Sequence, residues 1–168
     1  MSDRDDAGAA LVQLRRRVGD HFDAAVARTP EAFACRPGCS RCCGVRFGVF
    51  SVEADRIAAA LRELAARDPA QRERVRAQGR DPQHGACALL IDDRCSIYDE
   101  RPLICRSHGL PVRSAGRVEV CPLNFVAHEP PAPSVLALDA LNAPLSVLAR
   151  MWDPGAPRVE LAELAAAP

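Results

Sequence analysis

The chain has 168 residues, the size of one compact domain, and its 22 basic and 22 acidic residues leave no net charge. This balance argues against a general affinity for nucleic acid or for anionic lipid. Nearly half of the residues are apolar, but 30 of them are alanines and only seven are aromatic. We therefore expect a thin core, to which a metal that cross-links loops would add stability.

The N-terminal region predicts one amphipathic helix over residues 5–28. Leu11, Leu14, Val18 and Phe22 recur at three- and four-residue intervals, with charged residues between them. This period places the apolar side chains on one face of a helix. The charged residues exclude a signal peptide, and no later run reaches the ~18 apolar residues of a membrane helix. We therefore expect a cytoplasmic protein.

Half of the cysteines lie within nine residues: Cys35, Cys39, Cys42 and Cys43. Such short spacings bring thiolates to one cation or iron–sulfur cluster at little loop-closure cost. Pro37 and Gly38 suit the middle of a type II turn, and Cys39-x-x-Cys42 has the gap of a zinc knuckle. Neighbouring side chains are expected to diverge, so Cys43 would serve a second metal, another cluster atom or a redox role.

Two helices are expected after this segment. Residues 45–52 predict a strand or an extended approach to the first helix, with Ser51 as its N-cap. The predicted buried stripe of that helix is Ile57, Leu61, Leu64 and Ala65. Asp68-Pro69 ends it, and a second, mostly polar helix is expected over 69–78.

The other four cysteines fall at the edges of short predicted elements: Cys87, Cys95, Cys105 and Cys121. Residues 87–98 predict two short strands around a turn, which would let the first two of these cysteines approach each other. Asp99 is the expected N-cap of a short helix that contains Cys105. Residues 110–120 predict another hairpin around Ser114-Ala115-Gly116.

A C-terminal helix is expected over 134–152, packed on the first helix, with Pro144 marking a helix start. Residues 153–168 have few large apolar side chains and predict a tail. The fold expected is mainly α with short β-hairpins: a single metal-binding domain over 1–152 with a cysteine-rich core at 35–125. Eight cysteines in a reducing compartment argue for metal or redox chemistry rather than for structural disulfides.

Two motifs carry a resemblance to a known family. Cys35-x3-Cys39-x2-Cys42-Cys43, followed by Cys95-Ser-Ile-Tyr-Asp-Glu-Arg-Pro-Leu-Ile-Cys105-Arg, resembles the bacterial CxxCxxCC family of zinc- or iron-chelating domains over about residues 35–125. The resemblance implies that the clustered cysteines, Cys95 and Cys105 are ligands. It implies that Ile97-Tyr98 and Arg101-Pro102 belong to the framework. A similar cluster occurs in flagellin lysine N-methylases, and the resemblance identifies no substrate.

Three other interpretations compete. Buried, inert thiols fit the polar surroundings of the 35–43 segment badly, although packing is a serious competitor for Cys87 and Cys121. The Cys35-x3-Cys39-x2-Cys42 spacing also matches radical S-adenosylmethionine enzymes, but too few residues follow for their α/β barrel. A thioredoxin-like oxidoreductase would need a βαβ pattern, which is missing.

Residues other than cysteine have weaker claims to the site. Six arginines close to cysteines would offset thiolate charge: Arg36, Arg41, Arg46, Arg94, Arg101 and Arg106. His108 follows Cys105 by three residues, and an exposed or backbone-bonded ring is the simpler expectation for it.

Two functional hypotheses remain, with all eight cysteines as candidate ligands. The favoured one is a metal-chelating protein that binds zinc or iron as a scaffold or in metal handling. It is favoured because no acid–base pair, phosphate loop or nucleophile with a partner base appears. The alternative is an iron–sulfur protein that takes part in redox or methylation-like protein modification with a protein partner, and it leaves enzymatic activity open.

Overall fold

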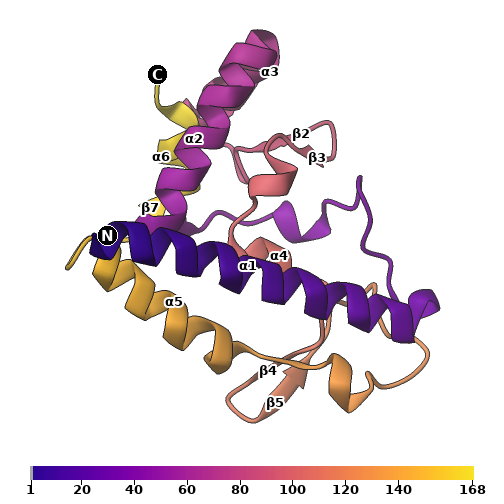
Figure 1. Ribbon diagram of the computed structural model, residues 1–168. Coiled ribbons are helices and arrows are strands. Elements are labelled where there is room, and N and C mark those ends of the chain that lie inside the picture. Colours follow the sequence, from indigo (N-terminus) through magenta and orange to yellow (C-terminus); the bar gives the residue numbers. More distant parts are fainter. Residues whose placement is uncertain (1) are drawn as a thin grey trace. The chain divides into compact units, whose positions relative to one another are not determined.

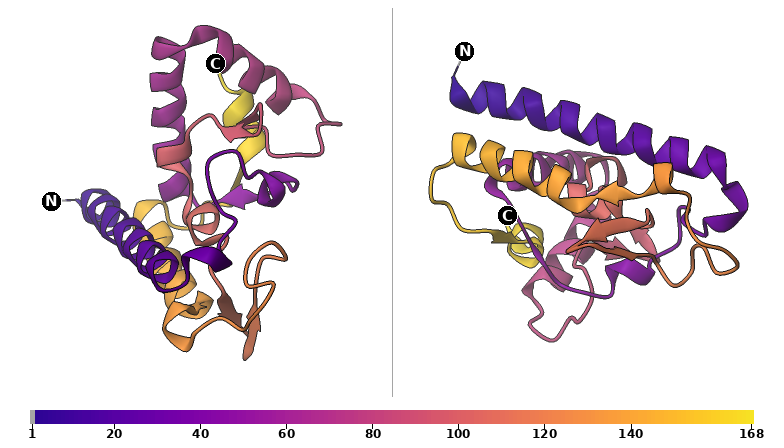
Figure 2. Two further views of the ribbon diagram at one scale, coloured as in Figure 1. Left: turned by 90° about the vertical axis from the view of Figure 1, so that its right-hand side faces the viewer. Right: turned by 90° about the horizontal axis from the view of Figure 1, so that it is seen from below.

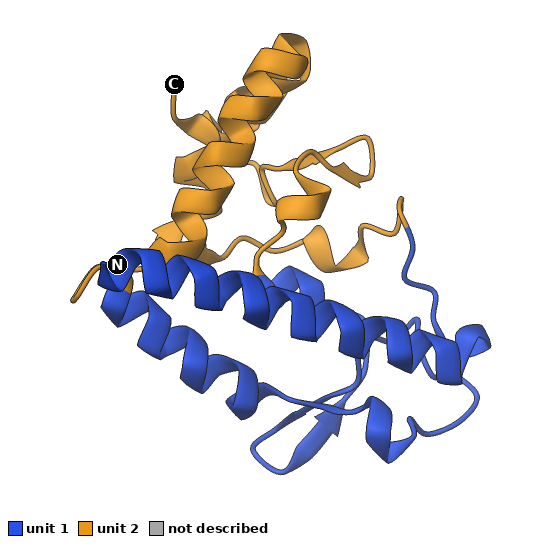
Figure 3. Ribbon diagram, in the orientation of Figure 1, with its two compact units in different colours: residues 1–36, 103–151 blue, residues 37–102, 152–168 orange. Residues whose placement is uncertain are grey.

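The computed structural model describes residues 2–168, which form two compact units (Figure 3). Unit 1 comprises Met1–Arg36 and Leu103–Met151, and unit 2 comprises Pro37–Pro102 and Trp152–Pro168. Both units are mainly helical with sheets of two or three short strands, so the predicted fold class is confirmed. Among residues 2–168, no helix combines the length and the apolar character that crossing a membrane requires.

Unit 1 combines two long helices with a small sheet. Its elements are α1 (Asp3–Arg28), η1 (Pro30–Ala32), α4 (Leu103–Ser107), β4 (Val112–Ser114), β5 (Arg117–Glu119), η4 (Ala132–Ser134), β6 (Leu136–Ala137) and α5 (Leu138–Trp152). Strand β4 pairs antiparallel with β5 and parallel with β6. Helix α5 lies alongside α1 and runs in the opposite direction (Figures 1 and 2).

The predicted N-terminal helix is confirmed as α1, and its start is fixed by a capping box. The Ser2 hydroxyl accepts the Asp5 N–H at 3.2 Å, and the Asp5 carboxylate accepts the Ser2 N–H at 3.0 Å. These bonds satisfy backbone donors that the first turn leaves without intrahelical partners. Leu11 and Val18 of the predicted stripe are buried.

Helix α5 corrects one prediction. Pro144 does not mark the start of the helix, because α5 begins at Leu138 and contains the proline. A proline removes one backbone hydrogen-bond donor from a helix. The burial of Leu141, Leu145 and Leu148 on both sides of Pro144 stabilises α5, so the helix continues through the proline.

Aromatic rings fix the segment after β5 against the end of α1. The Phe33 ring centroid lies 5.7 Å from that of Phe22 and 5.1 Å from that of Phe125. The Phe125 N–H donates to the Ala32 carbonyl at 2.9 Å. Phe125 has a φ of 54°, in the left-handed region that is unusual for a bulky residue. This packing determines where Asn124 lies.

Unit 2 is built on a helical pair with a C-terminal addition. Its elements are η2 (Arg41–Cys43), β1 (Gly48–Val49), α2 (Ser51–Arg67), α3 (Pro69–Arg80), β2 (Leu90–Ile91), β3 (Arg94–Cys95), η3 (Tyr98–Glu100), β7 (Val159–Glu160) and α6 (Leu161–Ala166). Strand β1 pairs antiparallel with β7, and β2 with β3. The core gathers buried side chains of the helices and of the hairpin: Ile57, Leu61, Leu64, Val75, Leu89, Ile91 and Leu161.

One predicted helix cap in this part of the chain is wrong. Ser51 is the first residue of α2, whose N-cap is Phe50 without a side-chain hydrogen bond. Asp99 lies inside η3, and its expected role as the N-cap of α4 stays a prediction. By contrast, Asp68 ends α2 as predicted, and its carboxylate also accepts the Gln71 N–H at 2.9 Å to start α3.

Both predicted hairpins are confirmed, and each has a two-residue turn. Asp92 and Asp93 connect β2 to β3 with φ values of 49° and 59°, and Ala115 and Gly116 connect β4 to β5 with values of 48° and 76°. Two successive positive φ angles are the signature of a type I′ turn, which matches the twist of the paired strands.

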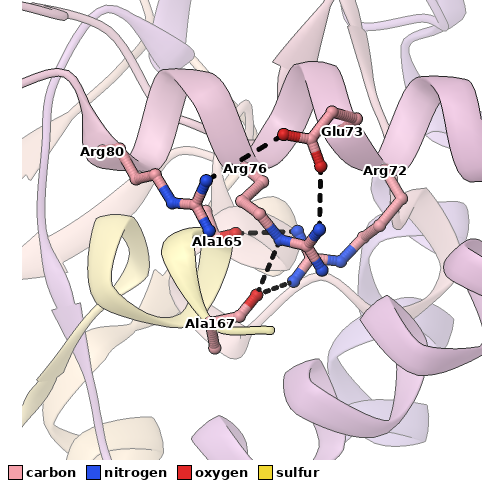
Figure 4. Close-up of polar contacts among 6 residues, drawn as sticks. All are labelled: Arg72, Glu73, Arg76, Arg80, Ala165 and Ala167. Carbon is pink, nitrogen blue, oxygen red and sulfur yellow. Dashed lines mark hydrogen bonds and ion pairs between the residues drawn. The ribbon is translucent and has the colours of Figure 1, made fainter.

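The C-terminal segment differs from the expected tail at 153–168, because it contributes β7 and α6 to unit 2. The Arg72 guanidinium donates to the Ala165 carbonyl at 2.7 Å and to the Ala167 carbonyl at 2.5 Å, and Arg76 donates to the latter at 3.2 Å (Figure 4). Leu161 and Ala165 are buried. Small buried side chains and guanidinium donors from distant α3 hold this segment in place. The local sequence therefore lacks the pattern of large apolar residues that would have predicted a packed helix.

The contact between α3 and α6 requires a glycine. A Cβ atom at Gly79 would lie 2.6 Å from the Ala166 nitrogen and 2.7 Å from the Ala162 oxygen. Gly19, inside α1, has no such neighbour within 4 Å.

We predict opposite effects of alanine at these two positions. Gly19→Ala should raise the free energy of unfolding by about 0.5–1 kcal/mol through helix propensity. Gly79→Ala should lower it by about 1–3 kcal/mol, because backbone atoms of α6 must move away. Urea unfolding followed by circular dichroism measures both changes. Equal changes in the two variants would contradict the close packing of α6 on α3.

Candidate metal centre

Four cysteines of unit 2 converge from three segments of the chain. Cys42 and Cys43 lie in η2, and the Cys43 carbonyl accepts the Cys87 N–H at 2.8 Å. Cys95 lies in β3, opposite Leu90. Cys43, Cys87 and Cys95 all belong to or pack against the apolar cluster of unit 2. The predicted approach of the two cysteines that flank the hairpin is therefore observed at the edge of this core.

The surroundings of these thiols disfavour their charged form. A hydrogen bond with the Cys43 thiol, together with burial, raises the pKa of Cys42. Burial raises the pKa of Cys87, and it raises that of Cys95 to about 11. The thiol–thiol hydrogen bond also corrects the expectation that neighbouring side chains diverge, because the tight turn of η2 keeps the Cys42 and Cys43 side chains close. A divalent cation reverses this electrostatic balance, since a coordinated thiol is deprotonated.

Backbone donors point at two of these sulfurs. The Leu89 N–H donates to the Cys87 sulfur, and the Ile97 N–H donates to the Cys95 sulfur. Each bond lowers the pKa of its thiol, although less than burial raises it. Hydrogen bonds of this kind orient thiolate ligands and tune the metal that they bind.

One of the six arginines acts on this group of thiols. The Arg101 guanidinium lies 3.5 Å from the centroid of the Tyr98 ring, and its Nε donates to the Tyr98 carbonyl at 2.9 Å. Its positive charge lowers the pKa values of Cys42 and Cys95, against the larger effects that raise them. Arg46 instead donates to the Pro82 carbonyl at 3.3 Å. The Tyr98 ring thus holds the Arg101 guanidinium in place, as expected for a framework residue.

Unit 1 contains three further cysteines: Cys35, Cys105 and Cys121. The Cys35 sulfur accepts a hydrogen bond from the Asn124 side-chain nitrogen at 3.3 Å. The same sulfur lies against Gly109, where a Cβ atom would collide with it. The Asn124 N–H donates to the Cys121 carbonyl at 2.8 Å, and Cys105 lies in α4.

Sequence reasoning missed Asn124 and Gly109 as residues of the site. Asn124 follows Cys121 by three residues, which is the only local signal that could have drawn attention to it. Its side chain meets partners about ninety and fifteen positions away, and no local pattern encodes such distances.

Cys39 and His108 complete the predicted site residues. Cys39 lies in unit 2 directly after Gly38, whose φ of 94° is the positive value that the predicted type II turn requires. The exposed His108 ring bonds through Nδ1 to the Ile104 carbonyl at 2.9 Å, which agrees with the simpler expectation for it. Since a carbonyl only accepts, Nδ1 is the donor.

The described thiols are not yet arranged as a coordination shell. Across residues 2–168, no three or more His, Cys, Asp and Glu side chains stand where they could hold a metal ion as they lie. All eight cysteines are thiols. The assignment of all eight as metal ligands stays a prediction.

Comparison with known proteins identifies the class to which the chain belongs. The model of the CxxCxxCC family, described as "Putative zinc- or iron-chelating domain", matches residues 34–122. The match covers more than half of the chain and includes all eight cysteines. The chain therefore belongs to this family of zinc- or iron-chelating cysteine domains. Searches of the curated proteins and of the solved structures gave no match.

The donor set fits the metals that the family description gives. Thiolates are soft ligands that suit zinc and iron, whereas magnesium and calcium prefer oxygen. Four sulfurs also suffice for one tetrahedral ion or for one four-cysteine cluster.

We predict that the position of Cys35 depends on the glycine beside it. Gly109 and Gly116 both have positive φ angles, 96° and 76°, but Gly116 has no neighbour within 4 Å that a Cβ atom would meet. Gly116→Ala should lower the free energy of unfolding by about 1–2 kcal/mol through backbone strain alone. Gly109→Ala should lower it clearly more, because the Cys35 sulfur must also move. Urea unfolding of the metal-free chain compares the two, and equal losses would contradict the packing of this sulfur on Gly109.

Proposed function

We propose that the cysteines of this protein bind zinc or iron, and that Cys42, Cys43, Cys87 and Cys95 form one centre. The observation that carries the proposal is the convergence of these four thiols from three segments at the edge of one core. The backbone N–H donors to the Cys87 and Cys95 sulfurs support the proposal, because they favour the thiolate form, which is the form that binds a metal cation.

In the favoured form of this proposal the metal has a structural or metal-handling role. It would cross-link η2, the segment at Cys87 and β3, which are each only a few residues long. Such short elements contribute little burial by themselves, so metal binding would supply part of the folding free energy of unit 2. Arg101 would offset part of the negative charge that thiolates leave on such a centre.

The second candidate is an iron–sulfur cluster held by the same thiols. Donors such as the Leu89 and Ile97 N–H groups tune the reduction potential of a cluster, so they are compatible with redox chemistry. The similarity of the motif to that of flagellin lysine N-methylases favours protein modification with a partner in this case. In either case we place the protein in the cytoplasm, where a reducing pool keeps eight thiols available.

Metal analysis after anaerobic purification, with a visible spectrum and a sulfide assay, tests the proposal. A colourless protein with stoichiometric zinc supports the scaffold, and a brown protein with acid-labile sulfide supports the cluster. A folded protein that holds and takes up neither metal would overturn both.

We predict that Cys39→Ala and Cys42→Ala each lower the metal content and cause partial unfolding. Cys42 belongs to the proposed centre, and the family motif implies that Cys39 is a ligand as well, so each variant removes one metal–sulfur bond and weakens the cross-link. The control is Ser40→Ala in the same loop, which removes only a hydrogen bond of 2.7 Å to Asp93 and should keep its metal. Cys121→Ala should have a smaller effect. Metal analysis and thermal melting of the four variants decide, and full loading of both loop variants contradicts the assignment.

Metal removal should destabilise the wild-type chain. A chelator that strips the metal should lower Tm, because binding to the folded state alone stabilises it by mass action. Addition of the same metal should restore Tm. A Tm that is the same with and without bound metal would speak against a structural role.

A further inference from the structure

Asn124 is a buried polar residue, only 2% exposed, that joins three parts of unit 1. Its side-chain oxygen accepts the Ala34 N–H at 2.8 Å. Its side-chain nitrogen donates to the Gly109 carbonyl at 2.7 Å and to the Cys35 sulfur at 3.3 Å. The amide is therefore used at both of its ends.

The partners of this amide fix its orientation. A backbone N–H can only donate, so the Asn124 oxygen must face Ala34, and a carbonyl can only accept, so the nitrogen must face Gly109. The group that faces the Cys35 sulfur is therefore an N–H donor. Such a donor stabilises a sulfur that accepts, and a thiolate accepts more strongly than a thiol.

The sulfur and the amide are both held in place. The Asn124 N–H donates to the Cys121 carbonyl at 2.8 Å, and the next residue, Phe125, donates to the Ala32 carbonyl and packs on Phe33. Gly109 lies on the other side of the sulfur, where any Cβ atom would displace it. The rigid Asn124 donor and the absence of a side chain at Gly109 together fix the position of the Cys35 sulfur. Outer-shell residues hold a metal ligand in the same way.

We propose that Asn124 is a positioning residue for metal binding: its amide donates to the Cys35 sulfur and fixes that sulfur as a thiolate ligand. This inference rests on the proposed binding of zinc or iron by the cysteines, and it assigns a ligand role to Cys35, which is not one of the four cysteines of the centre proposed in unit 2. The competing explanation is purely structural, because Asn124 also ties the backbone of Ala34 to that of Gly109.

A double-mutant cycle in the full-length chain separates the two explanations. Asn124→Asp keeps an acceptor for the Ala34 N–H but removes the donor, and it is measured alone and together with Cys35→Ala. The probe is Zn²⁺, with affinity measured by chelator competition. Asn124→Asp should weaken Zn²⁺ binding about 10- to 100-fold in the wild-type background. It should cause no further loss when Cys35 is alanine, since the sulfur that the amide positions is then gone.

Each contrary result overturns the proposal. Wild-type affinity in Asn124→Asp does so, and so does an equal loss in both backgrounds, which is the signature of a structural role. Ser134→Ala is the control, because Ser134 is also buried in unit 1 and its hydroxyl has no hydrogen-bond partner among the described residues. This variant should bind Zn²⁺ as the wild type does.

A second variant keeps the proposal testable if Asn124→Asp fails to fold. Cys35→Ser retains an acceptor for the Asn124 amide but replaces the soft ligand, so it should fold and lose part of the thiolate-to-metal charge-transfer absorption of the Co²⁺-loaded protein. Unchanged absorption and unchanged Zn²⁺ affinity in Cys35→Ser would show that Cys35 is no ligand. Failure of the wild type to bind any of these metals would instead overturn the proposed function itself.

Discussion

The burial of thiols at the edge of a thin apolar core is the constraint on which the structure of unit 2 depends. Cys87 lies within the cluster that contains Ile57 and Leu89, and Cys43 and Cys95 pack against it. Burial favours the neutral thiol, whereas metal chelation requires the thiolate. Backbone N–H donors and the Arg101 guanidinium favour the thiolate and so oppose the effect of burial. A bound metal would shift the equilibrium fully to the thiolate.

Tight turns and small residues, rather than large elements, bring the sulfurs to their places. The left-handed pair Asp92-Asp93 reverses the chain so that β3 carries Cys95 back towards the segment of Cys87. In unit 1 the absence of a side chain at Gly109 leaves room for the Cys35 sulfur. The long helices form the scaffold, and the short segments between them contain the cysteine side chains.

Local patterns predicted much of the fold and part of the site. The three- and four-residue apolar period predicted α1, and turn residues predicted both hairpins with the approach of Cys87 and Cys95. The sequence could not indicate that α5 continues through Pro144, that Ala165 and Ala167 meet Arg72, or that Asn124 reaches Cys35. These features depend on partners distant in the chain, and local propensity carries no information about such contacts.

The order in which the chain visits its two units affects how it can fold during synthesis. Unit 1 begins with α1, but the rest of that unit starts only at Leu103, after all of Pro37–Pro102. The apolar face of α1 therefore leaves the ribosome long before α4 and α5 exist to cover it. Contacts this distant in sequence slow folding, so the apolar stripe of α1, which includes Leu11 and Val18, would stay uncovered in the nascent chain until residues 103–151 are made.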